Sequence, residues 1–273
     1  MRLSRRSALS LRAGALIYLA LLLLLPLGVV LVRTFEHGLS VAWGWMTTPA
    51  AVSALSLSLL IAAIAVPLNT VFGVACAHIL VRGRSRGRAL LDSLIDLPFV
   101  VSPVIVGLAL ILVYGRDGWF GNWFVDHGIR IIFAVPGMVL ATVFVSLPFV
   151  VREVAPVLRE IGNEQEEAAA TLGAGRWQTF SRITLPAIRW GVAYGVVLTT
   201  ARALGEIGAV LVVSSNVAGS TLTLPLLVYQ RFDSQIGPQA IAGAYAAATE
   251  LIFLSLVVLV AMTLLSSRRT EAQ

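Results

Sequence analysis

Six long apolar stretches dominate this sequence and limit what it can fold into. They cover approximately residues 13–32, 54–80, 91–114, 131–151, 191–213 and 241–265. A helix of about 20 apolar residues crosses the hydrocarbon of a bilayer, and a backbone in lipid must satisfy its own hydrogen bonds. The sequence therefore predicts an all-α integral membrane protein with about six transmembrane helices.

The composition agrees with a chain that lies mostly in lipid. Of its 273 residues, 58% are hydrophobic and 12% are charged, which is about half the charged share of soluble domains. Six spans with short loops use this length and leave no room for a nucleotide-binding domain. The single cysteine, Cys76, cannot form an internal disulfide, and the three histidines are scattered. We therefore expect neither a disulfide framework nor a metal site.

The first apolar stretch follows four arginines, as the core of a secretory signal peptide would. It is about 20 residues long, however, and lacks a clear small-x-small cleavage site. We expect it to be retained as the first membrane helix.

The placement of the arginines predicts the orientation of the chain, because positive residues concentrate in cytoplasmic loops. All 20 basic residues are arginines, and fifteen of them flank the spans on one side, against four on the other. The majority group is Arg2, Arg5, Arg6, Arg12, Arg82, Arg84, Arg86, Arg88, Arg152, Arg159, Arg176, Arg182, Arg189, Arg268 and Arg269, and the minority group is Arg33, Arg116, Arg130 and Arg231. Both termini and the second and fourth loops are therefore expected in the cytoplasm.

The fourth loop, residues 152–189, is the longest cytoplasmic segment and has the pattern of a helical hairpin. Glutamates precede alanines over residues 164–170, which favours a helix start that complements the helix dipole. Gly173 then permits a sharp reversal, and apolar residues recur at three-residue spacing over 177–183. We expect two short helices joined by a turn, with Pro186 starting the fifth membrane helix.

This loop resembles the EAA loop of bacterial ABC-importer permeases. The matching residues are Glu167, Ala168, Ala169, Gly173, Ile183, Leu185 and Pro186. In that family the loop forms a coupling helix that docks on a cytoplasmic ATPase, and the resemblance gives this role to the matching residues together with Glu166. It also implies a type I ABC importer permease architecture without an ATPase site or cofactor of its own, because the partner ATPase binds ATP and Mg. The alternative is an ordinary amphipathic helix between two spans.

Further segments resemble the CysW family of sulfate/thiosulfate permeases. They are residues 95–99, 132–137, 148–153, 177–180, 203–210 and 221–226. The resemblance implies import of sulfate, with thiosulfate as a further substrate, across the cytoplasmic (inner) membrane of a bacterium. The implied partners are a second homologous permease in a heterodimer, two ABC ATPase subunits and an extracytoplasmic sulfate-binding protein, with no nucleic acid. The family usually has Phe where Ile207 stands.

Other functions are weighed against this interpretation. Permeases for molybdate and tungstate share residues 204–206, so one of these oxyanions is an alternative substrate. A secondary transporter or channel working alone is a third hypothesis, but the chain has a coupling loop and no repeated half. No catalytic constellation supports a membrane enzyme.

The chain also divides into three expected parts and carries charges inside its spans. We expect an N-terminal segment with the first helix (1–53), a permease core (54–265) and a cytoplasmic tail (266–273). Within the fifth span, Arg202 and Glu206 share one helix face, and charges inside spans are costly and often functional. They form either a self-neutralising pair at a protein interface or part of the path of a dianion.

Asp92 and Asp96 are acidic residues near the start of the third apolar stretch. We expect them to start the third helix, where the helix dipole would stabilise them.

Overall fold

The computed structural model describes residues 5–83, 87–234 and 237–270, and within these ranges all regular structure is helical. The elements are α1 (Arg5–Phe35), α2 (Leu39–Met46), α3 (Pro49–Arg82), α4 (Arg88–Val100), α5 (Pro103–Tyr114), α6 (Gly121–Asp126), α7 (Val135–Ile161), α8 (Glu164–Thr171), α9 (Arg176–Thr179), the π-helical turn η1 (Phe180–Thr184), α10 (Leu185–Ala187), α11 (Arg189–Leu204), α12 (Gly208–Val213), α13 (Leu224–Asp233) and α14 (Gly237–Thr270).

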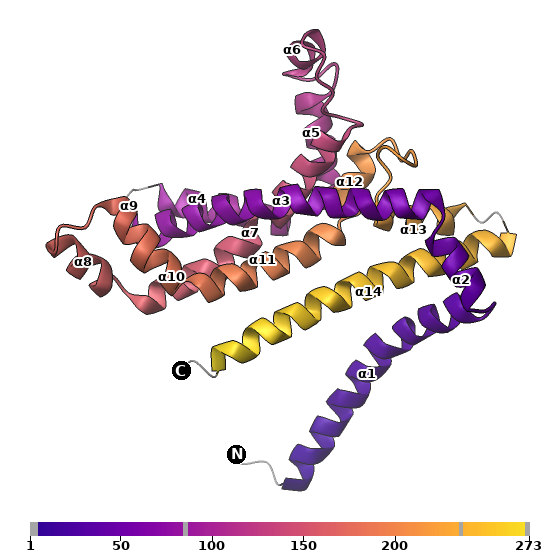
Figure 1. Ribbon diagram of the computed structural model, residues 1–273, viewed down its shortest axis with the longest axis horizontal. Coiled ribbons are helices and arrows are strands. Elements are labelled where there is room, and N and C mark those ends of the chain that lie inside the picture. Colours follow the sequence, from indigo (N-terminus) through magenta and orange to yellow (C-terminus); the bar gives the residue numbers. More distant parts are fainter. Residues whose placement is uncertain (1–4, 84–86, 235–236, 271–273) are drawn as a thin grey trace.

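The long helices α3, α7, α11 and α14 run along the long axis of the molecule (Figure 1). The hairpin of α8, α9 and α10 lies at one end, and α2 and α13 lie at the other. The first turn of α1 and the last turn of α14 point toward the hairpin end. This arrangement agrees with the predicted topology, in which both termini share a side with the fourth loop.

Part of the predicted topology falls outside the described chain. Arg2, Arg84 and Arg86 lie outside the described residues, as do residues 271–273 of the expected tail. The remainder of that tail, residues 266–270, continues α14 as helix.

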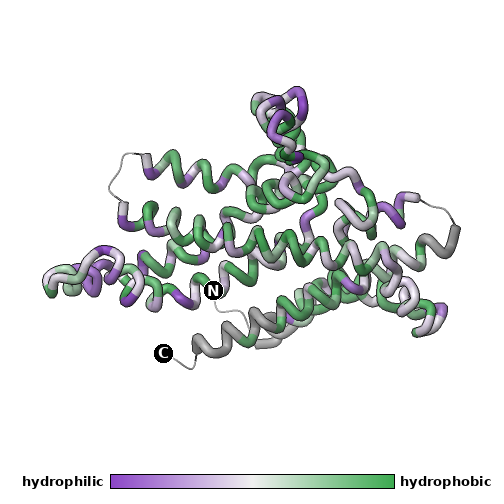
Figure 2. The backbone as a smooth tube through the Cα atoms, turned by 45° about the horizontal axis from the view of Figure 1, so that its top comes forward, coloured by the Kyte–Doolittle hydropathy of each residue, from purple (hydrophilic) through white to green (hydrophobic). Residues whose placement is uncertain are grey.

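Among the residues that the structure describes, four helices are long and apolar enough to cross a membrane, and the number rises to six if each bent pair is one span. Hydrophobic residues follow the helices, whereas hydrophilic ones gather at the hairpin and around α6 (Figure 2). The expected number of about six spans is therefore met only with two bent spans. The apolar window of α1 contains no buried residue, so this helix stands largely apart from the bundle.

The third predicted span is not one continuous helix. It divides into α4 and α5, whose axes are bent by 111°, and the break falls at Val101 and Ser102. Pro103 is the first residue of α5, where its missing N–H and fixed φ suit a helix start. Pro98, in contrast, stays inside α4.

The fifth predicted span also differs from a single helix. Its membrane helix, α11, begins at Arg189 after a 69° bend, whereas Pro186 lies before the bend in α10. α11 then ends at Leu204, and α12 begins at Gly208. A Cβ on Gly208 would lie 2.9 Å from the Cβ of Pro103, so the breaks in the third and fifth spans lie side by side.

Close contact between α3, α7 and α11 forms the inner part of the bundle. A Cβ on Gly73 would lie 2.6 Å from the Cβ of Val150, and one on Gly195 would lie 2.9 Å from the Val150 Cα. Asn69, fully buried, donates from Nδ2 to the Val143 carbonyl (3.1 Å) and to Ser146 Oγ (2.8 Å). Small residues and interhelical hydrogen bonds are the usual means of helix association in lipid.

Candidate functional site

The loop after α7 folds into the expected helical hairpin. α8 carries three glutamates in its first turn, and Gly173 follows it with a φ of +84°. The Gly173 and Ala174 N–H groups donate to the carbonyls of Ala170 (3.1 Å) and Ala169 (3.0 Å). A left-handed residue at this point favours glycine, so the local sequence accounts for the reversal.

The residues that match the EAA pattern do not all face the same way. Ala169 is buried, Ile183 is half-buried, and Glu167, Ala168, Gly173, Leu185 and Pro186 are exposed. Beside them, Leu172 is 88% exposed and Trp177 is 75% exposed, both next to the turn of the hairpin. Exposed large apolar side chains that cluster at one place commonly mark a protein contact. Neither Leu172 nor Trp177 was predicted to belong to the coupling site.

Glu166 faces into the molecule and uses both carboxylate oxygens. Its Oε2 accepts from Arg82 Nε at 3.0 Å, and its Oε1 accepts from Thr184 Oγ1 at 2.9 Å. A second nitrogen of Arg82 donates to the Gly162 carbonyl. The side chains of Arg82 and Glu166 are only 12% and 20% exposed. This cluster connects the end of α3, the start of α8 and η1.

Arg202 and Glu206 form the predicted i, i+4 pair, with 2.6 Å between Nη1 and Oε2. The Glu206 side chain is 2% exposed and that of Arg202 is 30% exposed. Glu206 Oε1 also accepts from the Ala209 N–H at 2.8 Å, which caps the first turn of α12. The pair therefore stabilises the break between α11 and α12. Of its two side chains, only that of Arg202 is partly exposed.

Asp92 and Asp96 do not start a helix as expected. α4 begins at Arg88 and has no acidic residue in its first turn. Both aspartates instead contact Arg152 of α7, at 2.9 Å from Asp92 Oδ1 to Nη2 and 2.8 Å from Asp96 Oδ1 to Nε. The partners are far apart in the sequence, so a pattern confined to one helix could not reveal this ion pair.

At the opposite end of the bundle, Arg231 joins three elements. It donates to the Gly243 carbonyl (2.8 Å) and to Thr48 Oγ1 (2.9 Å), and its guanidinium lies 5.3 Å from the Trp45 ring centroid. Burial lowers the pKa of Arg231, but a guanidinium stays protonated in proteins. Arg231 thus ties α13 to α14 and to the elbow between α2 and α3.

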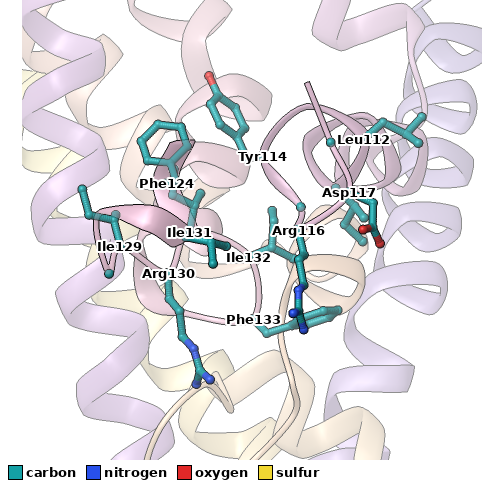
Figure 3. A pocket seen from close by; sticks show the side chains of 15 residues that line it. Leu112, Tyr114, Arg116, Asp117, Phe124, Ile129, Arg130, Ile131, Ile132 and Phe133 are labelled. Carbon is teal, nitrogen blue, oxygen red and sulfur yellow. The ribbon is translucent and has the colours of Figure 1, made fainter. Parts of the chain in front are cut away.

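A cleft of about 680 Å³ lies between the end of α5, α6 and the segment before α7. Its charged residues are Arg116, Asp117 and Arg130; Figure 3 shows Arg116 extending past Ile132 toward Phe133, whereas Arg130 extends away from both. Neither arginine has an ion-pair partner within the described ranges. No group of residues suited to a metal ion is found in the same ranges.

The chain has membrane-length helices, two spans that are broken beside the Arg202–Glu206 ion pair, and a hairpin with polar residues at one end. These features define a multi-pass membrane protein of the transporter class. Broken helices near intramembrane charges are typical of substrate pathways in such proteins. The chain belongs to the family of binding-protein-dependent transport system inner membrane components, whose family model matches residues 69–271.

Relatives with similar sequences cover almost the whole chain. The sulfate transport system permease protein CysW of Synechocystis sp. is 51% identical over 94% of this chain and 91% of its own length. CysW of Escherichia coli K12 is 44% identical over 91% of this chain and 84% of its own length. The permease protein CysT of the same strain is 39% identical over 89% and 88%.

A solved structure supports the fold. A chain of a bacterial ABC transporter that imports the acidic polysaccharide alginate superposes with a TM-score of 0.76, at 20% identity, over 96% of this chain and 95% of its own length. The expected all-α architecture of an ABC importer permease is therefore confirmed.

Proposed function

We propose that this chain is the permease subunit of an ATP-driven sulfate importer in the cytoplasmic (inner) membrane of a bacterium. The observation that carries the proposal is the 44–51% identity, over more than nine-tenths of the chain, to relatives named as sulfate permeases CysW. CysT proteins match less closely, at 38–39%. Two related permease types in one transport system support a heterodimer of this chain with a second, CysT-like permease.

The chemistry of ATP is assigned to other subunits. This chain needs no cofactor, since two ATPase subunits would bind ATP and Mg on the cytoplasmic side. The α8–α10 hairpin would contact one ATPase through exposed residues: Glu167, Ala168, Leu185 and Pro186 of the EAA pattern, with Leu172 and Trp177 at the tip. An extracytoplasmic binding protein would deliver sulfate from outside; the alginate transporter is known in complex with an alginate pentasaccharide-bound periplasmic protein.

Arg202 is the residue of this chain that we assign to the pathway. A dianion that crosses a low-dielectric layer needs polar donors, because an unpaired charge there costs several kcal/mol. The guanidinium of Arg202 is partly accessible, whereas Glu206 is buried beneath it and tempers its charge. Such a neutralised arginine would offer sulfate a transient contact and would not trap it.

The test is uptake by the reconstituted complex. We would place this chain with its CysT-like partner and ATPases in proteoliposomes, add the sulfate-loaded binding protein, and measure uptake of radiolabelled sulfate with and without internal ATP. The proposal expects ATP-dependent uptake that excess thiosulfate reduces and molybdate or tungstate does not. Uptake that does not depend on ATP would contradict the proposal of an ATP-driven importer. Uptake of molybdate in preference to sulfate would contradict the proposed substrate.

A further inference from the structure

The two adjacent glutamates of the α8 hairpin have different surroundings. Glu167 is exposed, and its carboxylate has no side-chain partner among the described residues. Glu166 has both oxygens engaged within the chain, by Arg82 of α3 and Thr184 of η1. We propose that Glu166 is a positioning residue that fastens the hairpin to the inner end of α3, while Glu167 makes the contact with the ATPase. This inference rests on the proposed function, because it assumes that the hairpin couples to an ATPase.

Helix α8 has little else to fasten it to α3, whereas Phe180 of η1 packs edge-on against His78 of α3. Ala169 is the only buried residue of α8, so apolar packing contributes little to its position. A hollow of about 480 Å³ opens between the last turns of α3 and the hairpin, with Arg82, Glu166, Phe180 and Thr184 in its lining. The side chains of Arg82 and Glu166 bridge this hollow. A partly buried, hydrogen-bonded ion pair holds its geometry better than an exposed one.

The link reaches the tightly packed part of the bundle. Arg82 is the last residue of α3, and about two and a half turns earlier α3 packs against α7, where Gly73 lies next to Val150 with no free space between them. Val150 in turn lies against Gly195 of α11, the helix that ends at the break beside Glu206. Packed interiors transmit strain. A displacement of the hairpin by the ATPase can therefore pass through Arg82 and α3 to α7 and α11.

The chain itself supplies matched variants for the test. Glu166→Gln and Arg82→Gln each break the link, and Arg82→Glu combined with Glu166→Arg reverses its polarity while keeping the pair. Glu167→Gln is the control, because it removes the same charge from the adjacent residue. Each variant would be assembled with its partner subunits, and the measured quantities would be copurified ATPase, basal ATP hydrolysis, and hydrolysis stimulated by the loaded binding protein.

The inference predicts that the variants affect stimulated hydrolysis differently from basal hydrolysis and copurified ATPase. Glu166→Gln and Arg82→Gln should retain the ATPase and basal hydrolysis, and should lose stimulation by about fivefold or more, the scale of a typical coupling between sites. The reversed pair should recover most of the stimulation, whereas Glu167→Gln should reduce the copurified ATPase. Normal stimulation in both single variants would overturn the inference. Loss of copurified ATPase in Glu166→Gln, with no recovery in the reversed pair, would show that Glu166 itself contacts the ATPase.

A second measurement does not depend on transport. Cysteines at positions 82 and 166, introduced after Cys76→Ala, should be joined in the purified chain by a bifunctional thiol reagent whose spacer replaces the two long side chains, which meet at their tips. A pair at positions 82 and 167 should crosslink much less. Equal crosslinking of both pairs would refute the geometry, even if the complex imported a different substrate or none at all.

Discussion

The ion pair between Arg202 and Glu206 should respond unequally to the loss of either half. Arg202→Gln leaves a carboxylate that is 2% exposed without its counter-charge, and breaking a buried pair in this way costs about 3–5 kcal/mol. Glu206→Gln leaves Arg202 without its counter-charge, but the Arg202 side chain is 30% exposed and can be hydrated. A glutamine at position 206 can also still accept from the Ala209 N–H, so the loss should be about 1 kcal/mol.

The double variant should resemble Glu206→Gln, because no buried charge is left alone. Unfolding of the purified chain in mixed micelles, followed by tryptophan fluorescence, would measure all three variants. Arg159→Gln is the control, since this exposed arginine lacks a side-chain partner among the described residues and should change stability by less than about 0.5 kcal/mol. Equal losses in the two single variants, or a double variant as unstable as Arg202→Gln, would refute the reasoning. Transport by the double variant then tests the pathway: poor uptake supports a role for Arg202, and full uptake leaves the pair purely structural.

Three further predictions concern topology, the hairpin and the inner bundle. In a chain carrying Cys76→Ala, an impermeant thiol reagent applied to intact cells should label a cysteine at position 122 and spare one at 167, and the reverse pattern would exclude the proposed orientation. Gly173→Val should strain a left-handed backbone by about 1–2 kcal/mol and reduce stimulated ATP hydrolysis, whereas Gly173→Asn should be tolerated; equal effects would argue against strain. Gly73→Val should destabilise the chain by about 1–3 kcal/mol through overpacking against the Cβ of Val150, and Val150→Gly, which removes that Cβ, should restore part of the loss; failure of the second change to do so in thermal unfolding would exclude this contact.

Hydropathy and local patterns were sufficient for much of this fold. The apolar stretches correspond to the long helices because lipid permits helices and excludes most alternatives. The hairpin was also predictable, since the glutamates, alanines and Gly173 each favour their local conformation. Its coupling role, like the proposed division of the chain into three parts, stays a prediction.

The features that could not be predicted depend on contacts between distant segments. The break after α4 lies against the start of α12, with Gly208 against Pro103, and residues 91–114 form one apolar stretch in the sequence. The pairing of Arg152 with Asp92 and Asp96 joins separate helices, so helix-start chemistry was the wrong interpretation. The inward orientation of Glu166 likewise depends on Arg82, which is 84 residues away.

The contact between the two broken spans has a consequence for biogenesis. α5 is apolar along its length, yet only Val106 and Gly107 are buried in it, and a Cβ on Gly107 would lie 2.7 Å from the Cβ of Val212 in α12. During synthesis the N-terminal part of a chain emerges first, so α5 leaves the ribosome long before α12 exists. Until then α5 lacks the helix that it packs against most closely, and a straight hydrophobic helix is the simplest form for the insertion machinery to release into lipid. The bend would then be acquired late, when the fifth span arrives.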